Sequence, residues 1–378
     1  MKSVSRLHSQ PTRHHAGLFS RPAARRFVQV IRLAEICTAV LAAAVLVAVL
    51  VPAGSTPAAQ AGPEKPDLTV AVVPAADSAG FFVALHDGLF KREGLTVHFE
   101  PAVSSETVID QQSLSTPSSP SALDVTCGNY ISYVEAQEAW ERGQRPSPSR
   151  PGVVAANLDI VAEGSVMQAA TQGLYTMPGS PVRSLADLHG KIIGINAPLG
   201  ILYLLIASVL AQHALPVSSV HFAYVPLPLM AGALAAGTVQ AAELPEPFAA
   251  QAEQRYGVRT LADLDQGAAT AFPVQGCVVT KRWAAEYPRT LAAFYRAFEQ
   301  GQEIADTSRT AVERAMEALP TPLSVSRGTA ALMALDSYPV SGGEPGTVDL
   351  ARLARVVDVM RQFLGFPAFA IQTMLISA

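Results

Sequence analysis

Cysteine is scarce in this sequence, and the few cysteines are isolated. Three occur in 378 residues, and the two beyond the first 61, Cys127 and Cys277, have no Cys-x-x-Cys partner. Centres built on clustered cysteines are therefore not expected. The histidines beyond residue 61 also lack metal-ligand spacing; they are His86, His98, His189, His213 and His221. Because a glycine-rich phosphate loop is missing too, the sequence predicts no metal, no cofactor and no catalytic residues.

Basic residues are also few once the N-terminal segment is set aside. The whole chain has 27 Lys and Arg against 31 Asp and Glu. Residues 1–61 hold seven of those bases and one of those acids, which leaves 20 bases, 30 acids and a net charge of −10 in residues 62–378. Nucleic acids and anionic lipid surfaces attract basic proteins. We therefore expect neither of them as a partner.

The first 61 residues have the order of a signal peptide. Their bases come first, the sixteen uncharged residues Ile36–Val51 follow, and the small-x-small sequence Ala59-Gln60-Ala61 comes last. This order predicts export and cleavage after Ala61. An uncleaved membrane anchor is the alternative, although sixteen residues fall short of the about 20 that span a bilayer. Arg25-Arg26 leaves a twin-arginine export route open.

The body of the chain alternates strand-like and helix-like segments. Leu68–Val73 is an apolar run of strand length, a helical apolar pattern runs from Phe81 to Phe90 and ends at Gly94, and Thr96–Glu100 alternates like a strand. Further strands are expected at 123–127, 191–195, 238–242 and 277–280, and further helices at 130–142, 201–213, 230–236, 288–306, 310–318, 326–335 and 350–364. This order predicts an α/β fold. The apolar content of the chain, 49%, suffices for two hydrophobic cores.

Four blocks of sequence carry a family resemblance. The first runs from Pro74 to Glu100 and includes Asp87-Gly88-Leu89-Phe90-Lys91 and Glu93-Gly94-Leu95-Thr96-Val97. The others follow in family order: Ser184-Leu185-Ala186-Asp187-Leu188-His189-Gly190-Lys191, Ala233-Leu234-Ala235-Ala236-Gly237-Thr238-Val239-Gln240-Ala241 and Glu246-Pro247-Phe248. Over roughly residues 66–320 the chain thus resembles the nitrate/sulfonate/taurine-type substrate-binding proteins of ABC transporters.

The resemblance implies a periplasmic-binding-protein-like fold of type 2, with two α/β lobes and a hinge of two crossing segments. These segments would fall near Gln172–Met177 and Gln275–Thr280. Lobe one would comprise residues 62–174 and 277–378, and lobe two residues 175–276. Cys127 and Cys277 would then lie on neighbouring strands of lobe one, where export would allow a disulfide. Two buried free thiols are the alternative.

The sequence departs from the family pattern at the start of one helix. Sulfonate-binding relatives usually have Ser or Thr hydroxyls there, whereas this chain has Ala197-Pro198-Leu199-Gly200. Elsewhere Gly80 replaces a frequent Pro and Gln240 replaces the usual Asp, and neither change removes the fold. We therefore expect a small, planar or partly apolar solute instead of a sulfonate. Helix-start N–H groups would still tolerate a weak anion.

Ligands of open α/β sheets bind beyond the carboxyl ends of the strands. Three turns and one glutamate meet that rule here, and the residues expected to bind the ligand are Ser78, Phe81, Phe82, Gly128, Asn129, Tyr130, Asn196, Leu199, Gly200 and Glu246. Some of them have a structural alternative. Phe81 or Phe82 can belong to the core, Asn129 can serve the backbone of its turn, and Glu246 can cap a neighbouring segment.

The function that follows from the resemblance is binding without chemistry. The chain would be a monomeric, extracytoplasmic component of an ABC importer, in the periplasm or at the cell surface, and would close around a small organic molecule or anion. Its partners would be separate permease and ATPase subunits. The alternative from another class is an enzyme of the thiamin-pyrimidine synthase or menaquinone-pathway type on the same fold. A membrane-tethered sensor is a third possibility.

Overall fold

The computed structural model describes residues 62–102, 104–114, 122–144, 154–167, 172–198, 200–321, 323–336, 341 and 343–376. The signal peptide and cleavage site expected in residues 1–61 lie outside this range. Residues 62–378 form one compact unit. Among the described residues, none of the helices has both the length and the apolar character needed to cross a membrane.

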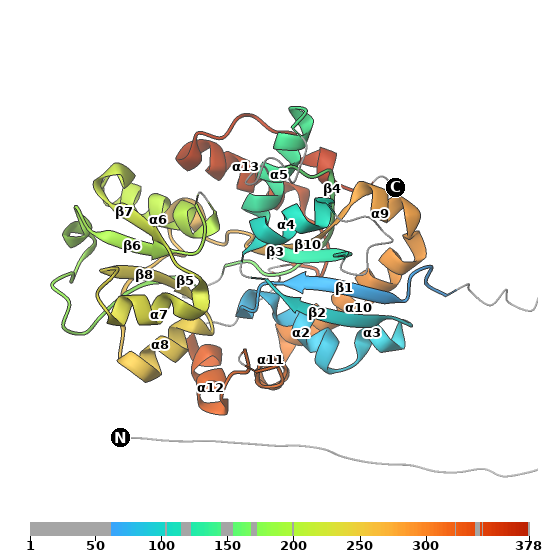
Figure 1. The fold of residues 1–378 in the computed structure, drawn as a ribbon, viewed down its shortest axis with the longest axis horizontal. Helices are drawn as coiled ribbons and strands as arrows, with labels where there is room; N and C mark the ends of the chain where they lie inside the picture. Colours follow the sequence, from blue (N-terminus) through green and yellow to red (C-terminus); the bar gives the residue numbers. More distant parts are fainter. Residues whose placement is uncertain are drawn as a thin grey trace, which may run out of the picture. The chain divides into compact units, whose positions relative to one another are not determined.

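The first of two five-stranded sheets in the described chain has the order β2-β1-β3-β10-β4 (Figure 1). Its strands are β1 (Asp67–Val72), β2 (Thr96–Pro101), β3 (Val125–Asn129), β4 (Leu158–Glu163) and β10 (Gln275–Thr280). β1 runs parallel to both β2 and β3, whereas β10 is antiparallel to both β3 and β4. Strands β3, β4 and β10 are buried almost throughout, as apolar runs in a covered sheet require.

Helices cover both faces of this sheet (Figure 1). On one face lie α2 (Ala79–His86), α3 (Leu89–Arg92) and α10 (Pro288–Thr307), and on the other lie α4 (Ser105–Leu114), α5 (Tyr130–Glu141) and α13 (Leu350–Leu364). Further helices are α9 (Lys281–Glu286), α11 (Arg309–Glu317) and α12 (Arg327–Asp336). The single helix expected from Phe81 to Gly94 is two helices, because Gly88 between them has φ 71° and breaks the first one.

The second sheet has the order β7-β6-β8-β5-β9. Its strands are β5 (Gln172–Thr176), β6 (Ile192–Ile195), β7 (His221–Tyr224), β8 (Ala241–Pro245) and β9 (Arg259–Asp263), and its helices are α6 (Ile201–Gln212), α7 (Leu227–Ala235) and α8 (Phe248–Tyr256). Single 3-10 turns are η1 (Ala76–Ser78), η2 (Leu185–Leu188), η3 (Val217–Ser219), η4 (Gly267–Ala269) and η5 (Ile371–Met374). The expected strand at 238–242 begins later, at Ala241, because Gly237 to Gln240 form a turn.

The two segments that cross between the sheets start earlier in the chain than expected. Gln172 already belongs to β5 of the second sheet, and Gln275 already belongs to β10 of the first. The crossings therefore precede these two residues. They hydrogen-bond to each other, because Met167 N donates to Phe272 O at 2.8 Å and Val274 N donates to Ser165 O at 2.9 Å. A short antiparallel bridge at the hinge results.

Cys127 and Cys277 form a disulfide, which confirms that they lie close together. They face each other directly in the register of β3 and β10, with Cα atoms 4.1 Å apart. Both side chains are fully buried. The bond joins a strand from the first half of the chain to one that returns after the second sheet.

Candidate ligand-binding site

A small cavity lies where strand ends of the two sheets meet. Its lining residues are Val73, Ala75, Asp77, Ser78, Ser105, Gly128, Asn129, Val274 and Gln275 next to the first sheet, and Gln172, Asn196, Ile201, Leu202, Leu227 and Pro245 next to the second. It leaves about 50 Å³ accessible to the centres of water molecules. The carboxyl ends of β1, β3, β6 and β8 all reach it, as the general rule for α/β sheets requires.

The turn after β1 brings a carboxyl group to the cavity. Asp77 accepts a hydrogen bond from Gln172 Nε2 at 2.8 Å and one from Ser165 Oγ at 3.4 Å. Burial raises the pKa of Asp77 to about 7, although the two hydrogen bonds act in the opposite direction. The neighbouring Ser78 Oγ donates to Val73 O at 2.7 Å and lies 3.1 Å from Gln275 Oε1.

Two glutamines at the ends of the crossing segments are only half satisfied. Gln172 Nε2 donates a hydrogen bond to Asp77, and Gln172 Oε1 has no hydrogen-bond partner among the described residues. Gln275 Oε1 accepts a hydrogen bond from Ser78 Oγ, and Gln275 Nε2 has no hydrogen-bond partner among the described residues. Both side chains are almost fully buried and line the cavity. Since buried polar groups are normally hydrogen-bonded, these two atoms mark the cavity wall as incompletely satisfied in the free protein.

The turn after β3 holds its polar side chain in a fixed orientation. Asn129 Oδ1 accepts from the backbone N of Ser132 at 3.0 Å and so caps α5, and its Nδ2 donates to Ser105 Oγ at 3.0 Å. Gly128 is required next to it, because a Cβ there would lie 2.1 Å from Ser105 Oγ. Asn129 therefore lines the cavity and serves the backbone at the same time.

The turn after β6 contributes a helix start without a side-chain cap. Gly200 is the N-cap of α6 and makes no side-chain hydrogen bond, so the first N–H groups of this helix are open to a ligand. Asn196 precedes it and lines the cavity with a partly exposed side chain. Leu199, which is also expected to bind the ligand, lies outside the described residues.

Several predicted site residues lie away from the cavity. Phe81 and Phe82 are buried in the core of lobe one, where both rings contact the ring of Phe99. Tyr130 is also buried, and its ring packs edge-on against Tyr133. Phe81 and Phe82 on α2 and Tyr130 on α5 belong to separate buried clusters, and helical spacing turns each of these rings inward. For Phe81 and Phe82 the structure thus favours the core alternative.

Glu246 caps a neighbouring backbone segment, which was the structural alternative to ligand binding. Its carboxylate accepts from the backbone N of Ala250 at 3.2 Å, at the first turn of α8. The residue is buried and does not line the cavity. Ser78, Gly128, Asn129 and Asn196 are the predicted residues that the structure brings together there.

The sequence pointed less clearly to the residues that give the cavity its charge and hydrogen-bonding character. Asp77 directly precedes the predicted Ser78, and Gln172 and Gln275 begin the two predicted hinge segments, but none of them is among the predicted binding residues. Glu243 on β8 is not among them either. It is fully buried, and neither carboxylate oxygen has a hydrogen-bond partner among the described residues. Burial, and then the charge of Asp77, raise its pKa well above the ordinary value. A lone polar residue inside an apolar strand was the available signal.

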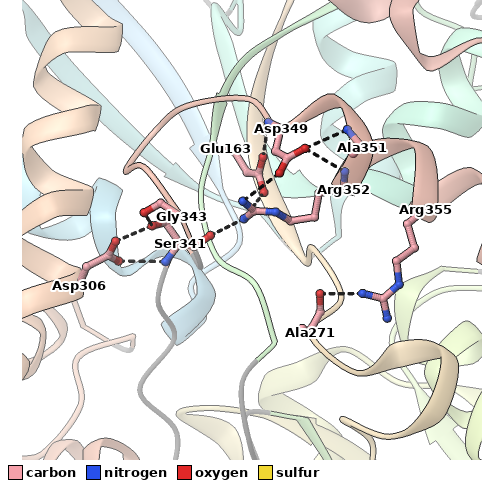
Figure 2. A network of polar contacts seen from close by, with 9 residues as sticks. All are labelled: Glu163, Ala271, Asp306, Ser341, Gly343, Asp349, Ala351, Arg352 and Arg355. Atoms are coloured by element: carbon pink, nitrogen blue, oxygen red, sulfur yellow. Dashed lines mark hydrogen bonds and ion pairs between the residues drawn. The ribbon is translucent and has the colours of Figure 1, made fainter.

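The C-terminal helix α13 and the residue before it make an ion pair and hydrogen bonds to both crossing segments (Figure 2). Arg352 Nη1 lies 2.9 Å from Oε1 of the buried Glu163, at the end of β4 where the first crossing begins. Arg352 also donates to Ser341 O, and Asp349 N donates to Glu163 Oε2 at 2.9 Å. One turn on, Arg355 donates to the carbonyl of Ala271 at 3.1 Å in the second crossing. The hinge beside the cavity is thus held from one helix.

A larger hollow of about 710 Å³ lies elsewhere, against α9 and α10 of lobe one. Its charged residues, Asp159 and Lys281, form an ion pair with each other at 3.4 Å. This pair leaves no unbalanced charge to recognise a ligand. The smaller cavity between the sheets is therefore the better candidate. Among the described residues there is no group of three side chains that could hold a metal ion.

Comparison with known proteins supports the family resemblance. The model of the NMT1-like family matches residues 61–319, which is more than half of the chain. No curated protein matches the sequence. The resemblance inferred from the four sequence blocks is confirmed at the level of the family.

Solved structures share the fold at low identity. The ligand-binding component of an ABC-type import system from Staphylococcus aureus, solved with zinc bound, is 14% identical with a TM-score of 0.65, over 82% of this chain and 96% of that one. The alkanesulfonate-binding protein SsuA from Xanthomonas axonopodis pv. citri, bound to MOPS, is 16% identical with a TM-score of 0.62, over 82% and 96%. The periplasmic nitrate-binding protein NrtA from Synechocystis PCC 6803 is 14% identical with a TM-score of 0.65, over 83% and 85%. These likenesses confirm the two-lobed α/β fold.

Proposed function

The chain belongs to the NMT1-like family, and on this premise we propose that it is the extracytoplasmic solute-binding component of an ABC importer. It captures a small organic molecule between its lobes and delivers it to separate permease and ATPase chains. The observation that carries this proposal is the cavity lined by strand ends of both sheets. The import-system, alkanesulfonate-binding and nitrate-binding relatives of the same fold support a binding role.

Capture works by movement of one lobe against the other about the crossing segments. Gln172 and Gln275 sit at the ends of these segments and line the cavity, and each has one polar atom without a partner among the described residues. A ligand that satisfies these atoms favours the closed arrangement, because it interacts with both lobes only when they meet. The solute itself therefore supplies the free energy that shifts the population of closed molecules.

Export follows from the sequence of residues 1–61, whose basic segment, apolar run and small-x-small site form a signal peptide. The mature protein then works outside the cytoplasm as a monomer. Its acidic body keeps it away from nucleic acid and anionic lipid.

The solute is small and partly apolar. Apolar side chains make up much of the cavity lining, including Val73, Ile201, Leu202, Leu227 and Val274, and the accessible space is about 50 Å³. A few polar groups among apolar walls are the usual composition of a small-molecule site. The lining residues Ser78, Asn129, Asn196 and Gln275 orient the ligand through hydrogen bonds.

The test is capture of a solute that depends on the cavity. The purified protein is incubated with a metabolite extract, washed, and examined by native mass spectrometry and by small-angle X-ray scattering. We expect a bound small molecule and a decrease in radius of gyration. Both should disappear in Asn196→Trp, which fills the cavity from a partly exposed position.

Tyr224→Trp is the matched control, because Tyr224 is 61% exposed on β7 and does not line the cavity. This variant should bind like the wild type. Equal retention of the solute by Asn196→Trp and wild type would show that binding occurs elsewhere.

A further inference from the structure

The charge around the cavity has one sign. Asp77 is the charged residue among those that line it, and no lysine or arginine is among them. Two more acids lie on β8 and in the turn after it. Glu243 is fully buried, and the charge of Asp77 helps to raise its pKa, while Glu246 caps α8 just beyond the strand. Of these three acids Asp77 is the one that lines the cavity, and the lining residues include no cation to balance it.

The cavity wall has one unpartnered acceptor and one unpartnered donor group on its buried side chains. Gln172 Oε1 lacks a partner among the described residues, and so does Gln275 Nε2. A ligand with N–H groups can donate to Gln172 Oε1 and to the carboxylate of Asp77, whereas a ligand made only of acceptors leaves Gln172 Oε1 without a donor.

We propose that the cavity takes a small organic cation with N–H donors, such as an amidinium or guanidinium group, and that Asp77 is its charge partner. The inference rests on the proposed solute-binding function and adds the chemical class of the solute. A carboxylate accepts two parallel N–H donors from a planar cation of this kind, which makes the pair geometrically specific. Gln172 is already hydrogen-bonded to Asp77 and so offers its Oε1 to the same ligand from the second sheet.

Helix N-termini are the competing effect, because they favour anions. The first N–H groups of α6 are open, and an N-terminus has roughly half a positive charge. At α5, however, Asn129 already accepts from Ser132 N, and at α2 the backbone N–H of Ala79 donates to Ala76 O within η1. The uncapped starts of α6 and α7 thus compete with Asp77 in the same small cavity. Each is a partial charge spread over backbone groups, whereas an ionised carboxylate is a full charge, so the cation is favoured when Asp77 is ionised.

The ionisation of Asp77 makes the inference measurable. Burial raises the pKa of Asp77 to about 7 in the free protein, so the carboxyl is partly protonated near neutral pH. A cation stabilises the ionised form, so its affinity should rise between pH 6 and pH 8, by roughly tenfold. An anion should show the opposite trend, and a neutral ligand should show almost none.

The experiment uses three molecules of nearly equal size that differ in charge: acetamidine, acetamide and acetate. Acetamidine is a cation and acetate an anion at both pH values. Each is titrated into the purified protein and followed by ligand-observed NMR at pH 6 and pH 8. We expect acetamidine to bind more tightly than the other two, and more tightly at pH 8 than at pH 6.

Matched variants connect the result to the cavity. Asp77→Asn keeps the size of the side chain and removes its charge, so acetamidine binding should weaken and lose its pH dependence. Asp358→Asn removes one acid from α13, where the side chain is 73% exposed, and should change neither property. Thermal unfolding of Asp77→Asn shows that the variant is folded.

Preference for acetamide or acetate, or acetamidine binding that Asp77→Asn leaves unchanged, overturns the cation inference. If that preferred molecule is still excluded by Asn196→Trp, the solute-binding function stands and only the chemical class is wrong. Absence of acetamidine binding overturns the inference as well, and the proposed function is then decided by the capture of metabolites described above.

Discussion

At the scale of single residues, Asp77 is a carboxyl group at the cavity whose ionised form costs stability in the free protein. The residue is only partly exposed, and no basic residue is among those that line the cavity with it. The raised pKa of Asp77 means that the charged form is disfavoured in the free, folded protein. Groups with strongly shifted pKa values cluster at functional sites, which agrees with the proposed role of Asp77 as the charge partner of a ligand.

Asp77→Asn should therefore stabilise the free protein at alkaline pH. Because the pKa of Asp77 rises from 3.8 unfolded to about 7 folded, its folded form holds a proton that the unfolded form releases between these values. The wild type thus loses stability as pH rises through this window, and the variant does not. We expect the variant to be more stable by about 1–3 kcal/mol at pH 8 and by less at pH 5. Urea unfolding at both pH values measures the difference, and an equal gap at both would contradict the explanation.

At the scale of elements, α13 links the two crossing segments through neighbouring arginines. Arg352 pairs with the buried Glu163, and Arg355 holds carbonyl groups of the second crossing (Figure 2). Burial raises the pKa of Glu163 to about 7, although Arg352 and the backbone N of Asp349 act against that rise. Removing the arginine would leave a buried carboxyl without its charge partner.

Arg352→Met should destabilise the protein by about 3 kcal/mol at pH 8, because breaking a buried ion pair is costly. The loss should be smaller at pH 5.5, where Glu163 is protonated in the folded protein. Chemical unfolding at the two pH values measures it. Arg361→Met, on the same helix with a side chain that is 54% exposed, is the control and should change stability little. Equal losses from both variants would mean that the ion pair contributes nothing.

The disulfide joins β3 and β10 across a sequence separation of 150 residues. Cross-linking of so long a loop restricts the unfolded chain strongly. Replacing both cysteines by serine should therefore lower the free energy of unfolding by about 2–5 kcal/mol. The midpoint of thermal unfolding, compared between this double variant and the wild type, reports the effect. A wild-type protein treated with reductant should match the variant, and a midpoint unchanged in both would refute the expectation.

At the scale of the whole molecule, the lobes share a core. One cluster of buried apolar residues includes Ile131 and Val134 of α5, Leu204 and Leu205 of α6, and Val356 of α13. Helix α12 also packs against α8 of the second lobe. The C-terminal helices therefore contact both lobes, which the assignment of residues 277–378 to lobe one alone did not anticipate.

Because of this shared core, both lobes should unfold in one transition. The chain has two tryptophans, Trp140 on α5 and Trp283 on α9, so fluorescence reports on the first lobe. Far-ultraviolet circular dichroism reports on the helices of both lobes. We expect the two signals to change at the same urea concentration, as in two-state unfolding. A fluorescence transition separated from the dichroism transition would show that the lobes unfold independently.

The sequence by itself determined the class of this protein. Apolar runs of strand length, helical periodicity and four ordered motifs are local properties, and they were enough to predict the α/β lobes and the family. The cysteine pair followed from the family topology. Turns at strand ends likewise predicted Ser78, Gly128, Asn129 and Asn196, because that rule depends only on where each strand stops.

Tertiary structure alone decided which side chains face the ligand and which charge they present. Helical spacing cannot tell a ring in the core from a ring in a cavity, so Phe81 and Phe82 could not be placed from the sequence. Gln172 and Gln275 are about a hundred residues apart in the chain, and only the crossing segments bring them together. The lining of the cavity gives Asp77 no basic partner, and among the described residues Glu243 has no hydrogen-bond partner; both facts likewise depend on which residues surround the two carboxyl groups. Such an absence is a property of the folded molecule, because burial and distance set the electrostatic free energy of a carboxyl group.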